Sequence, residues 1–338
     1  MTVSDTGANA TTDTTLAVVR QARLRRSDPN GPGIRRLNGD PPRYVDAGGR
    51  RVTDRQQLDR ILALAIPPAW QEVWISADER GHIQAVGTDD AGRRQYLYHE
   101  DWRKQRDAAK FDRALLLARS LPAARRRVTR DLRREGFGHE RALAAAFRVI
   151  DRVSMRIGSE EYLRRYGSRG LTTLQCRDVV VEGDTITLHF PSKSGQRWDS
   201  EVTDPELARY LADVIRARRP SGRAIAWRSS AWHALTTGEV NDYIRSRTGV
   251  DATAKDFRTL RGTIVAASVL SRVGPQRTKR ERDAAVRAAV DATAEALGNT
   301  PAVARSSYID PRVLDRYRSG ELLSRKGAPE AALCSLLS

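Results

Sequence analysis

Apolar residues in the second half of the chain recur at the three-to-four-residue spacing that gathers them on one face of a helix. From about residue 205 onward this pattern predicts one helix after another, over residues 205–217, 236–246, 256–272, 281–297, 301–309 and 311–318. The same spacing between Leu143 and Val153 predicts a helix over residues 140–157, which Gly158 would end as a left-handed residue. This part of the chain is therefore expected to be mainly α-helical.

A second pattern, in which every other residue is apolar, interrupts these helices. Ile186, Leu188 and Phe190 alternate with polar residues, as a strand with one buried face requires. Strands are expected over residues 171–174, 179–181, 185–190 and 197–202. The hairpin between the last two strands, residues 191–195, should present Lys193 at its tip.

The N-terminal part mixes short strands with one helix. Runs of β-branched and aromatic residues between glycine-containing turns predict strands at residues 73–75, 82–86 and 95–98. Thr53 stands three residues before Gln56, which is the spacing of a helix-capping box. A short helix is therefore expected here, ending before Pro67.

Together these patterns predict an α+β chain with two domains. The expected order is a disordered arm over residues 1–30, a β-rich domain over 31–118, an α-rich domain over 119–325 and a flexible tail over 326–338. The link between the two domains is expected near residues 120–122, which end in a proline.

The net charge of the chain indicates which class of partner it binds. The 338 residues include 59 Lys and Arg against 42 Asp and Glu, which gives a net charge of +17 and a pI of about 10.6. Such an excess favours a polyanionic partner, with nucleic acid as the first candidate and an anionic membrane as the second. A GC-rich genome would also raise the number of arginines, but it would not explain the sign of the imbalance.

Several other classes of protein are disfavoured. Cys176 and Cys334 stand far apart, and neither they nor the five histidines have the spacing of a disulfide framework or a metal site. The chain has no apolar run long enough to span a bilayer and no signal peptide at its N-terminus. A soluble cytoplasmic protein without a metal is expected.

Five residues suit a transesterification at a phosphodiester without a metal. Such a reaction needs a nucleophile, cations that hold the non-bridging oxygens, a proton donor for the leaving oxygen and a hydrogen-bonded cradle. Arginine matches two phosphate oxygens with its planar fork, and lysine can donate a proton when a neighbouring cation lowers its pKa. The candidates are Arg156, Lys193, Arg258, Asn299 and Tyr308.

Taken singly these residues are ordinary, but their order and local sequences are not. The chain resembles the type IB DNA topoisomerases, and most of all their small bacterial and poxvirus branch, in the order of Arg156, Lys193, Arg258 and Tyr308. The similarity runs from about residue 35 to residue 323. It includes Ile-Pro-Pro-Ala-Trp at residues 66–70 and Gly-Arg-Arg-Gln-Tyr-Leu-Tyr at residues 92–98.

This resemblance implies a C-shaped clamp of two domains around double-stranded DNA, formed by a monomer that needs no ATP, metal or other cofactor. Tyr308 would attack a phosphate, form a 3′-phosphotyrosyl link and free a 5′-hydroxyl, which attacks back after the nicked duplex has swivelled. Arg156 and Arg258 would neutralise the phosphorane-like state, and Lys193 would protonate the leaving oxygen. Supercoiled DNA would thereby relax, which places the protein at the nucleoid.

One position departs from the family. Many members, and the related tyrosine recombinases, have a histidine where this chain has Asn299. An amide can still donate a hydrogen bond to a phosphate oxygen, although it carries no charge. A positional role in catalysis is expected, and the alternative is a structural role, either as the cap of the next helix or in support of the Gly-Asn turn.

Further DNA contacts are expected outside the catalytic set. Tyr96 and Tyr98 fall on one face of a strand and suit groove and backbone contacts, and Gln95 could reach a base edge if that strand enters the major groove. The alternative is that the two tyrosines are half-buried residues of a sheet. The expected DNA-binding residues are Arg93, Arg94, Gln95, Tyr96, Tyr98, Tyr162 and Lys255. The arginine-rich run over residues 125–134 is expected to be a solvated helix face that also meets phosphate.

Two alternatives stay open. A tyrosine recombinase uses similar chemistry, but its signature has a histidine three residues before the second arginine, where this chain has Lys255. A DNA-packing protein without enzymatic activity would explain the charge, but the spaced Arg, Lys, Arg and Tyr would then be accidental. A cleavage assay separates an enzyme from a binding protein, and a strand-exchange assay separates the two enzymes.

Overall fold

The structure is a computed structural model that describes residues 23–338 and divides into two compact units, one ending at Ala109 and one beginning at Lys110. Most of the expected disordered arm, residues 1–22, lies outside the described residues. Its remainder is ordered, because Leu24 is buried in a cluster with Trp102 and the backbone of Arg25 pairs with that of His82. The expectation of disorder was therefore wrong for residues 23–30.

The N-terminal unit is built on one antiparallel sheet with the strand order β2-β1-β3-β4-β5. Its strands are β1 (Ile34–Leu37), β2 (Arg43–Val45), β3 (Gln71–Ile75), β4 (Ile83–Thr88) and β5 (Arg94–Tyr98). Helix α2 (Arg55–Ala63) buries Ile61 in the core of this unit. The helix confirms the expectation, but its cap is Asp54, which accepts a hydrogen bond from the Gln56 amide, and not Thr53.

The longest helix, α3 (Glu100–Leu132), runs through the stretch in which a link between domains was expected. Pro122 lies inside this helix. Its neighbours Leu121 and Ala124 are buried in the core, so tertiary packing outweighs the cost of a proline within a helix. The expected link near residues 120–122 is therefore wrong.

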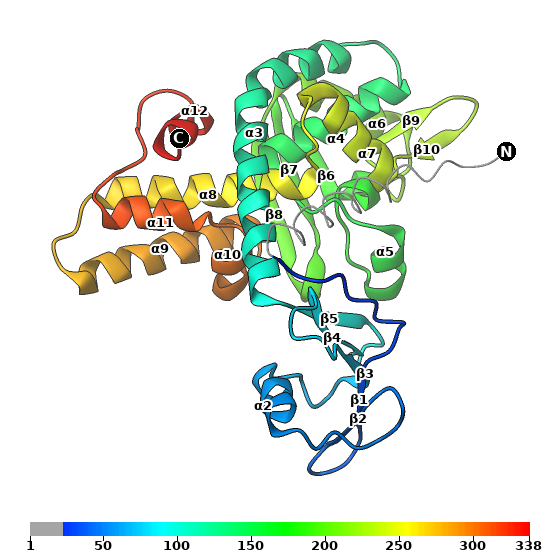
Figure 1. Cartoon of the computed structure of the whole chain (residues 1–338). Helices are drawn as coiled ribbons and strands as arrows, with labels where there is room; N and C mark the ends of the chain where they lie inside the picture. The colour runs from blue at the N-terminus through cyan, green and yellow to red at the C-terminus, as the bar shows by residue number, and fades with distance from the viewer. Residues whose placement is uncertain (1–22) are drawn as a thin grey trace. The chain divides into compact units, whose positions relative to one another are not determined.

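In the C-terminal unit, helices pack around a three-stranded antiparallel sheet (Figure 1). The strands are β6 (Val179–Glu182), β7 (Thr185–Pro191) and β8 (Arg197–Thr203), in that order, and a short hairpin follows with β9 (Ala226–Arg228) and β10 (Trp232–Ala234). The remaining helices are α4 (His139–Val153), α5 (Glu160–Tyr166), α6 (Pro205–Ala217), α7 (Thr237–Thr248), α8 (Ala254–Val273), α9 (Lys279–Leu297), α10 (Pro301–Ser307), α11 (Pro311–Arg318) and α12 (Pro329–Leu336). α4 lies at the centre, where it contacts α6, α7 and α8.

Three details of this unit differ from the expectations. α4 ends at Val153, well before Gly158, because Ser154 adopts a left-handed φ of 55°. Residues 171–173 form a 3-10 turn where a strand was expected. The tail expected to be flexible contains α12, which buries Leu333 and pairs Glu330 with Arg125.

Candidate active site

The end of α4 brings Arg156 to two other segments of the chain. Its Nη2 donates to the Gly298 carbonyl at 2.9 Å and to Oδ1 of Asn299 at 2.6 Å. Its Nη1 lies 3.5 Å from Oγ of Ser192, the residue before Lys193. Burial, and then the charge of Arg258, lowers the pKa of the Arg156 guanidinium. Arg156 thus ties the α4 end to the β7–β8 hairpin and to the turn between α9 and α10.

Arg258 is fixed at the start of α8. It is 3% exposed, and its two terminal nitrogens donate to the carbonyls of Ser154 and Leu297, each at 2.7 Å. These carbonyls lie at the C-terminal ends of α4 and α9, so the guanidinium caps both helices. Its central carbon lies 5.2 Å from the centre of the Tyr308 ring. At that distance the cation is attracted to the ring face.

Tyr308 follows the last residue of α10, and its backbone amide bonds to the Ala304 carbonyl at 3.0 Å. Burial of the phenol raises its pKa, but the nearby cations outweigh burial, so the pKa of Tyr308 lies below its ordinary value of 10.0. The cations are Arg258, Lys255 and Arg156, in order of effect. The phenolate, which is the nucleophilic form, is therefore easier to populate here than in an isolated tyrosine.

Asn299 is not the cap of the helix that follows it. That position belongs to Thr300, whose side chain accepts a hydrogen bond from the Val303 amide. The Asn299 side chain turns to Arg156 instead, and its Nδ2 is a buried donor with no hydrogen-bond partner among residues 23–338. The Nε of Arg258 is likewise a buried donor without a hydrogen-bond partner in these residues. An unsatisfied buried donor costs about 1–3 kcal/mol, so an added acceptor such as a phosphate oxygen is favoured here.

The two lysines near this cluster differ in their position. Lys193 lies in a 3-10 turn at the exposed tip of the β7–β8 hairpin, and no hydrogen bond or ion pair joins it to the other four candidates within the described part of the chain. Lys255 is exposed on the first turn of α8 and lowers the pKa of Tyr308. From the sequence, Lys255 was predicted only as a DNA contact. Lys255 stands one helical turn before Arg258, and this spacing was the sequence signal that it could lie near the catalytic residues and act on Tyr308.

The expected DNA contacts of the N-terminal unit lie on β5 and in the turn before it. Tyr96 and Tyr98 share one face, with ring centres 6.0 Å apart, and Arg94 lies over the Tyr96 ring at 5.8 Å. Asp89 accepts hydrogen bonds from the side chains of Arg93 and Gln95, each at 2.8 Å. These residues therefore form an ordered group with aromatic, cationic and amide side chains. In the C-terminal unit, Tyr162 is exposed on α5.

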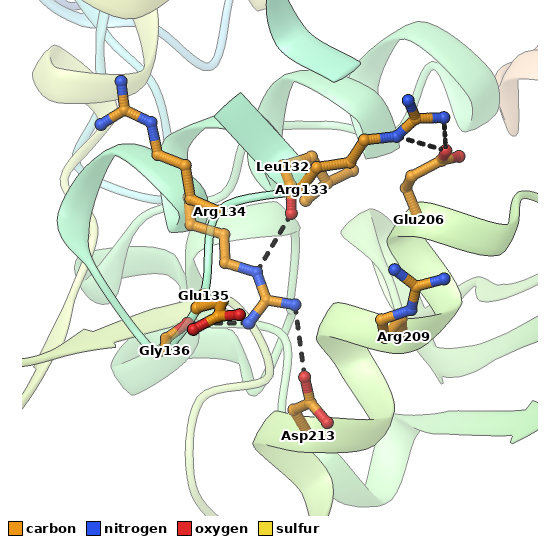
Figure 2. Close-up of a pocket in the computed structure, with 9 residues that line it drawn as sticks. Leu132, Arg133, Arg134, Glu135, Gly136, Glu206, Arg209 and Asp213 are labelled. Atoms are coloured by element: carbon orange, nitrogen blue, oxygen red, sulfur yellow. Dashed lines mark hydrogen bonds and ion pairs between the residues drawn. The ribbon is translucent and has the colours of Figure 1, made fainter. Parts of the chain in front are cut away.

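A pocket of about 290 Å³ lies among charged residues at the end of α3 and on α6 (Figure 2). Arg133 bonds to Glu206 there, and Arg141 donates to the Leu132 carbonyl and to Asp213. None of the five candidate catalytic residues lines it. Glu206 and Asp213 thus already pair with these two arginines.

Most arginines of the run over residues 125–134 are exposed, although some of them form ion pairs. Arg125 pairs with Asp151 at 2.8 Å and with Glu330 at 2.6 Å, and Arg134 pairs with Glu140. The expected solvated face is therefore confirmed for Arg126, Arg127, Arg130, Arg133 and Arg134, whereas Arg125 is half-buried and joins α3 to α4 and α12. The contact of this face with phosphate stays a prediction.

Two general features concern membranes and metals. Within residues 23–338, no helix is long and apolar enough to cross a membrane. In the same range, no group of three or more His, Cys, Asp and Glu side chains is arranged to hold a metal ion.

A tyrosine of lowered pKa beside two fixed arginines is an arrangement suited to attack on a phosphodiester. Residues 99–322 match the protein family described as eukaryotic DNA topoisomerase I, catalytic core. Residues 43–89 match the bacterial DNA topoisomerase IB N-terminal domain. The chain therefore belongs to the eukaryotic-type DNA topoisomerase I family, and its N-terminal unit carries the domain of the bacterial type IB members. The expected α+β fold and the family resemblance are confirmed.

Individual relatives agree with this assignment. DNA topoisomerase 1B of Acanthamoeba polyphaga mimivirus is 28% identical over 295 residues, which cover 84% of this chain and 87% of that protein. DNA topoisomerase 1 of Mycosarcoma maydis is 24% identical over 160 residues, which cover 45% of this chain and 16% of that protein. The protein is thus an isomerase of DNA, and the family match favours this class over a recombinase or a packing protein.

Proposed function

We propose that the protein relaxes supercoiled double-stranded DNA by cutting one strand with Tyr308, letting the duplex rotate and resealing the strand. The observation that carries this proposal is the phenol of Tyr308, whose pKa is lowered by Arg258, Lys255 and Arg156 against the opposing effect of burial. In the cutting step, the phenolate oxygen bonds to phosphorus while the bond from phosphorus to the 5′-oxygen breaks. The product is a 3′-phosphotyrosyl ester and a 5′-hydroxyl.

Arg156, Arg258 and Asn299 would hold the non-bridging oxygens of the phosphate. The two guanidinium groups supply positive charge where negative charge develops in the transition state. The buried Nδ2 of Asn299 and Nε of Arg258 supply hydrogen-bond donors that the described protein does not use. These cations do what a metal would otherwise do, so the proposed reaction requires none. It requires no ATP either, because the tyrosyl ester keeps the energy of the broken bond.

Lys193 would donate the proton to the leaving 5′-oxygen. Its hairpin is fixed on one side by Arg156, which contacts Ser192, while the lysine itself is exposed at the tip. A side chain with four methylene groups can then turn toward bound DNA. Resealing reverses these steps, with the 5′-hydroxyl returning its proton to Lys193 and Tyr308 leaving.

The group on β5, together with Tyr162 and Lys255, would bind the duplex. Arg93 and Arg94 suit phosphate, the tyrosines suit sugar and groove contacts, and Gln95 suits a base edge. Each protein molecule has one Tyr308, so a monomer is sufficient for cutting one strand. We place its action on chromosomal DNA in the cytoplasm.

A trapping experiment tests the nucleophile. A nicked or short duplex, labelled on the 3′ or the 5′ side of the cut, is incubated with the protein and run on a denaturing gel. Label should stay with the wild-type protein only when it lies on the fragment 5′ of the cut, because the 3′-phosphate of that fragment is bonded to the tyrosine. Tyr308→Phe should retain no label. Tyr317→Phe is the matched control, because Tyr317 is buried and donates to the Gly274 carbonyl at 3.0 Å. An adduct with Tyr308→Phe would refute the assignment.

A further inference from the structure

Helix α8 carries two residues beyond Arg258 that meet Tyr308. Gly262 lies one helical turn after Arg258, so both face the same side of the helix. A Cβ atom added at Gly262 would lie 2.7 Å from the backbone oxygen of Tyr308 and 2.9 Å from its Cβ. The backbone at Tyr308 therefore approaches α8 as closely as only a glycine permits.

Thr263 adds a specific bond to this close contact. The side chain is 3% exposed, and its Oγ1 lies 3.1 Å from the Tyr308 carbonyl oxygen and 2.9 Å from the Thr259 carbonyl. The same Oγ1 accepts a hydrogen bond from the Asp310 amide at 3.1 Å. The hydroxyl thus holds both ends of the turn that runs from Tyr308 to Asp310. Asp310 in turn is the N-cap of α11 and accepts a hydrogen bond from the Arg312 amide, so the turn is fixed on its far side as well.

We propose that Gly262 and Thr263 are positioning residues that set the place of Tyr308 relative to Arg258. This inference rests on the proposed role of Tyr308 as the nucleophile. One rigid helix then carries both the cation and the two residues that hold the nucleophile's backbone. The α8, α10 and α11 elements of this arrangement gather in one part of the C-terminal unit (Figure 1). Misplacing a reacting group by about 1 Å can reduce a rate by about 100-fold, so the contacts of Gly262 and Thr263 with the Tyr308 backbone should affect the rate of cleavage directly.

The first test removes the hydroxyl and keeps the shape. Thr263→Val should bind duplex DNA as the wild type does, but its single-turnover cleavage rate should fall by roughly 10- to 100-fold. Thr263→Ser restores the hydroxyl and should restore the rate. Thr248→Val is the matched control, because the half-buried Thr248 on α7 also donates to the carbonyl four residues earlier, at 2.7 Å, and accepts from a backbone amide, at 3.2 Å, without a hydrogen bond to Tyr308 or Gly262. It should cleave at the wild-type rate.

The second test keeps the hydroxyl and moves the backbone. Gly262→Ala removes a helix-breaking residue, which would stabilise an ordinary helix, yet here the new methyl group must displace Tyr308. A folded Gly262→Ala protein should cleave slowly even though it binds DNA. This variant decides the matter if Thr263→Val cannot be recovered folded.

The inference is overturned if Thr263→Val cleaves as fast as Thr248→Val, or if folded Gly262→Ala cleaves at the wild-type rate. Failure of the proposed function looks different, because Tyr308→Phe would then still form the covalent adduct. Loss of the adduct in Tyr308→Phe together with a wild-type rate in Thr263→Val would reject the positioning role alone.

Discussion

Replacing Asn299 by aspartate changes one buried atom and one charge in the proposed phosphate site. Asn299 accepts a hydrogen bond from Arg156 at 2.6 Å through Oδ1, and an aspartate of the same shape can keep that bond. Its second oxygen would take the place of the buried Nδ2, which has no hydrogen-bond partner in residues 23–338. A donor suited to a phosphate oxygen thus becomes a negatively charged acceptor. We expect the Asn299→Asp protein to fold and to cleave DNA very slowly.

The size of the effect follows from charge and distance. Two unit charges about 4 Å apart interact with about 4 kcal/mol when the effective dielectric constant is about 20. Repulsion of that size in the transition state corresponds to a rate lower by about a thousandfold. Asn299→Ala removes the donor without adding a charge, and the loss of one charge-assisted hydrogen bond of about 1.5–3 kcal/mol predicts a rate lower by about 10- to 150-fold.

A single-turnover cleavage assay measures these rates, with excess protein over a duplex that traps the covalent product. The control is Asn241→Asp, which changes the net charge equally at a residue whose amide oxygen accepts a hydrogen bond from the Ala254 backbone. Asn241→Asp should cleave within a few-fold of the wild type. A rate for Asn299→Asp equal to or above that of Asn299→Ala would show that the amide does not face the phosphate, and would refute the reasoning.

Three further predictions concern the acid, the nucleophile and the tail. Lys193→Ala should slow cleavage of ordinary DNA but recover most of the rate when sulfur replaces the leaving 5′-oxygen; without recovery in the same assay, Lys193 is not the acid. Because cations lower the pKa of Tyr308, the wild-type cleavage rate should rise with pH and level off below pH 10. Lys255→Ala removes one of these cations and should move the plateau to higher pH, so superimposable pH profiles would contradict the assignment. Removing residues 324–338 should lower the free energy of unfolding by about 1.5–3 kcal/mol or more, because the core loses the buried side chain of Leu333 and Arg125 loses its partner Glu330. A urea midpoint equal to that of the full chain would show that α12 does not support the core.

Periodicity was sufficient to locate the helices that bury one face in a common core. The expected helices at residues 205–217 and 311–318 coincide with α6 and α11, and the strand pattern of Ile186, Leu188 and Phe190 marks β7. These elements follow from local spacing, because each one repeats its buried positions at the period of its own geometry.

Long-range contacts decided the features that the sequence could not predict. α4 ends at Val153, and the carbonyl of the next residue, Ser154, accepts a hydrogen bond from Arg258, which lies far away in the sequence. The arginine at residue 125 looked like part of a solvated face until its partners Asp151 and Glu330 were in place. In both cases the partner comes from a distant segment, so no local pattern could have shown it.

In the candidate site, too, some features follow from local sequence and others from contacts between distant segments. Order and local sequence singled out Arg156, Arg258 and Tyr308, and the structure brings these three together. The bond between Arg156 and Asn299 and the contact of Gly262 with Tyr308 depend on how α4, α8 and α10 meet. The roles of Lys193 and of the group on β5 stay predictions, because they require bound DNA.

Relaxation of a supercoiled plasmid by the purified protein, in EDTA and without ATP, tests the central claim most directly. The wild type should convert the plasmid to relaxed topoisomers, and Tyr308→Phe should bind the plasmid and leave it supercoiled. Relaxation by Tyr308→Phe, or none by the wild type until a divalent metal or ATP is added, would contradict the account.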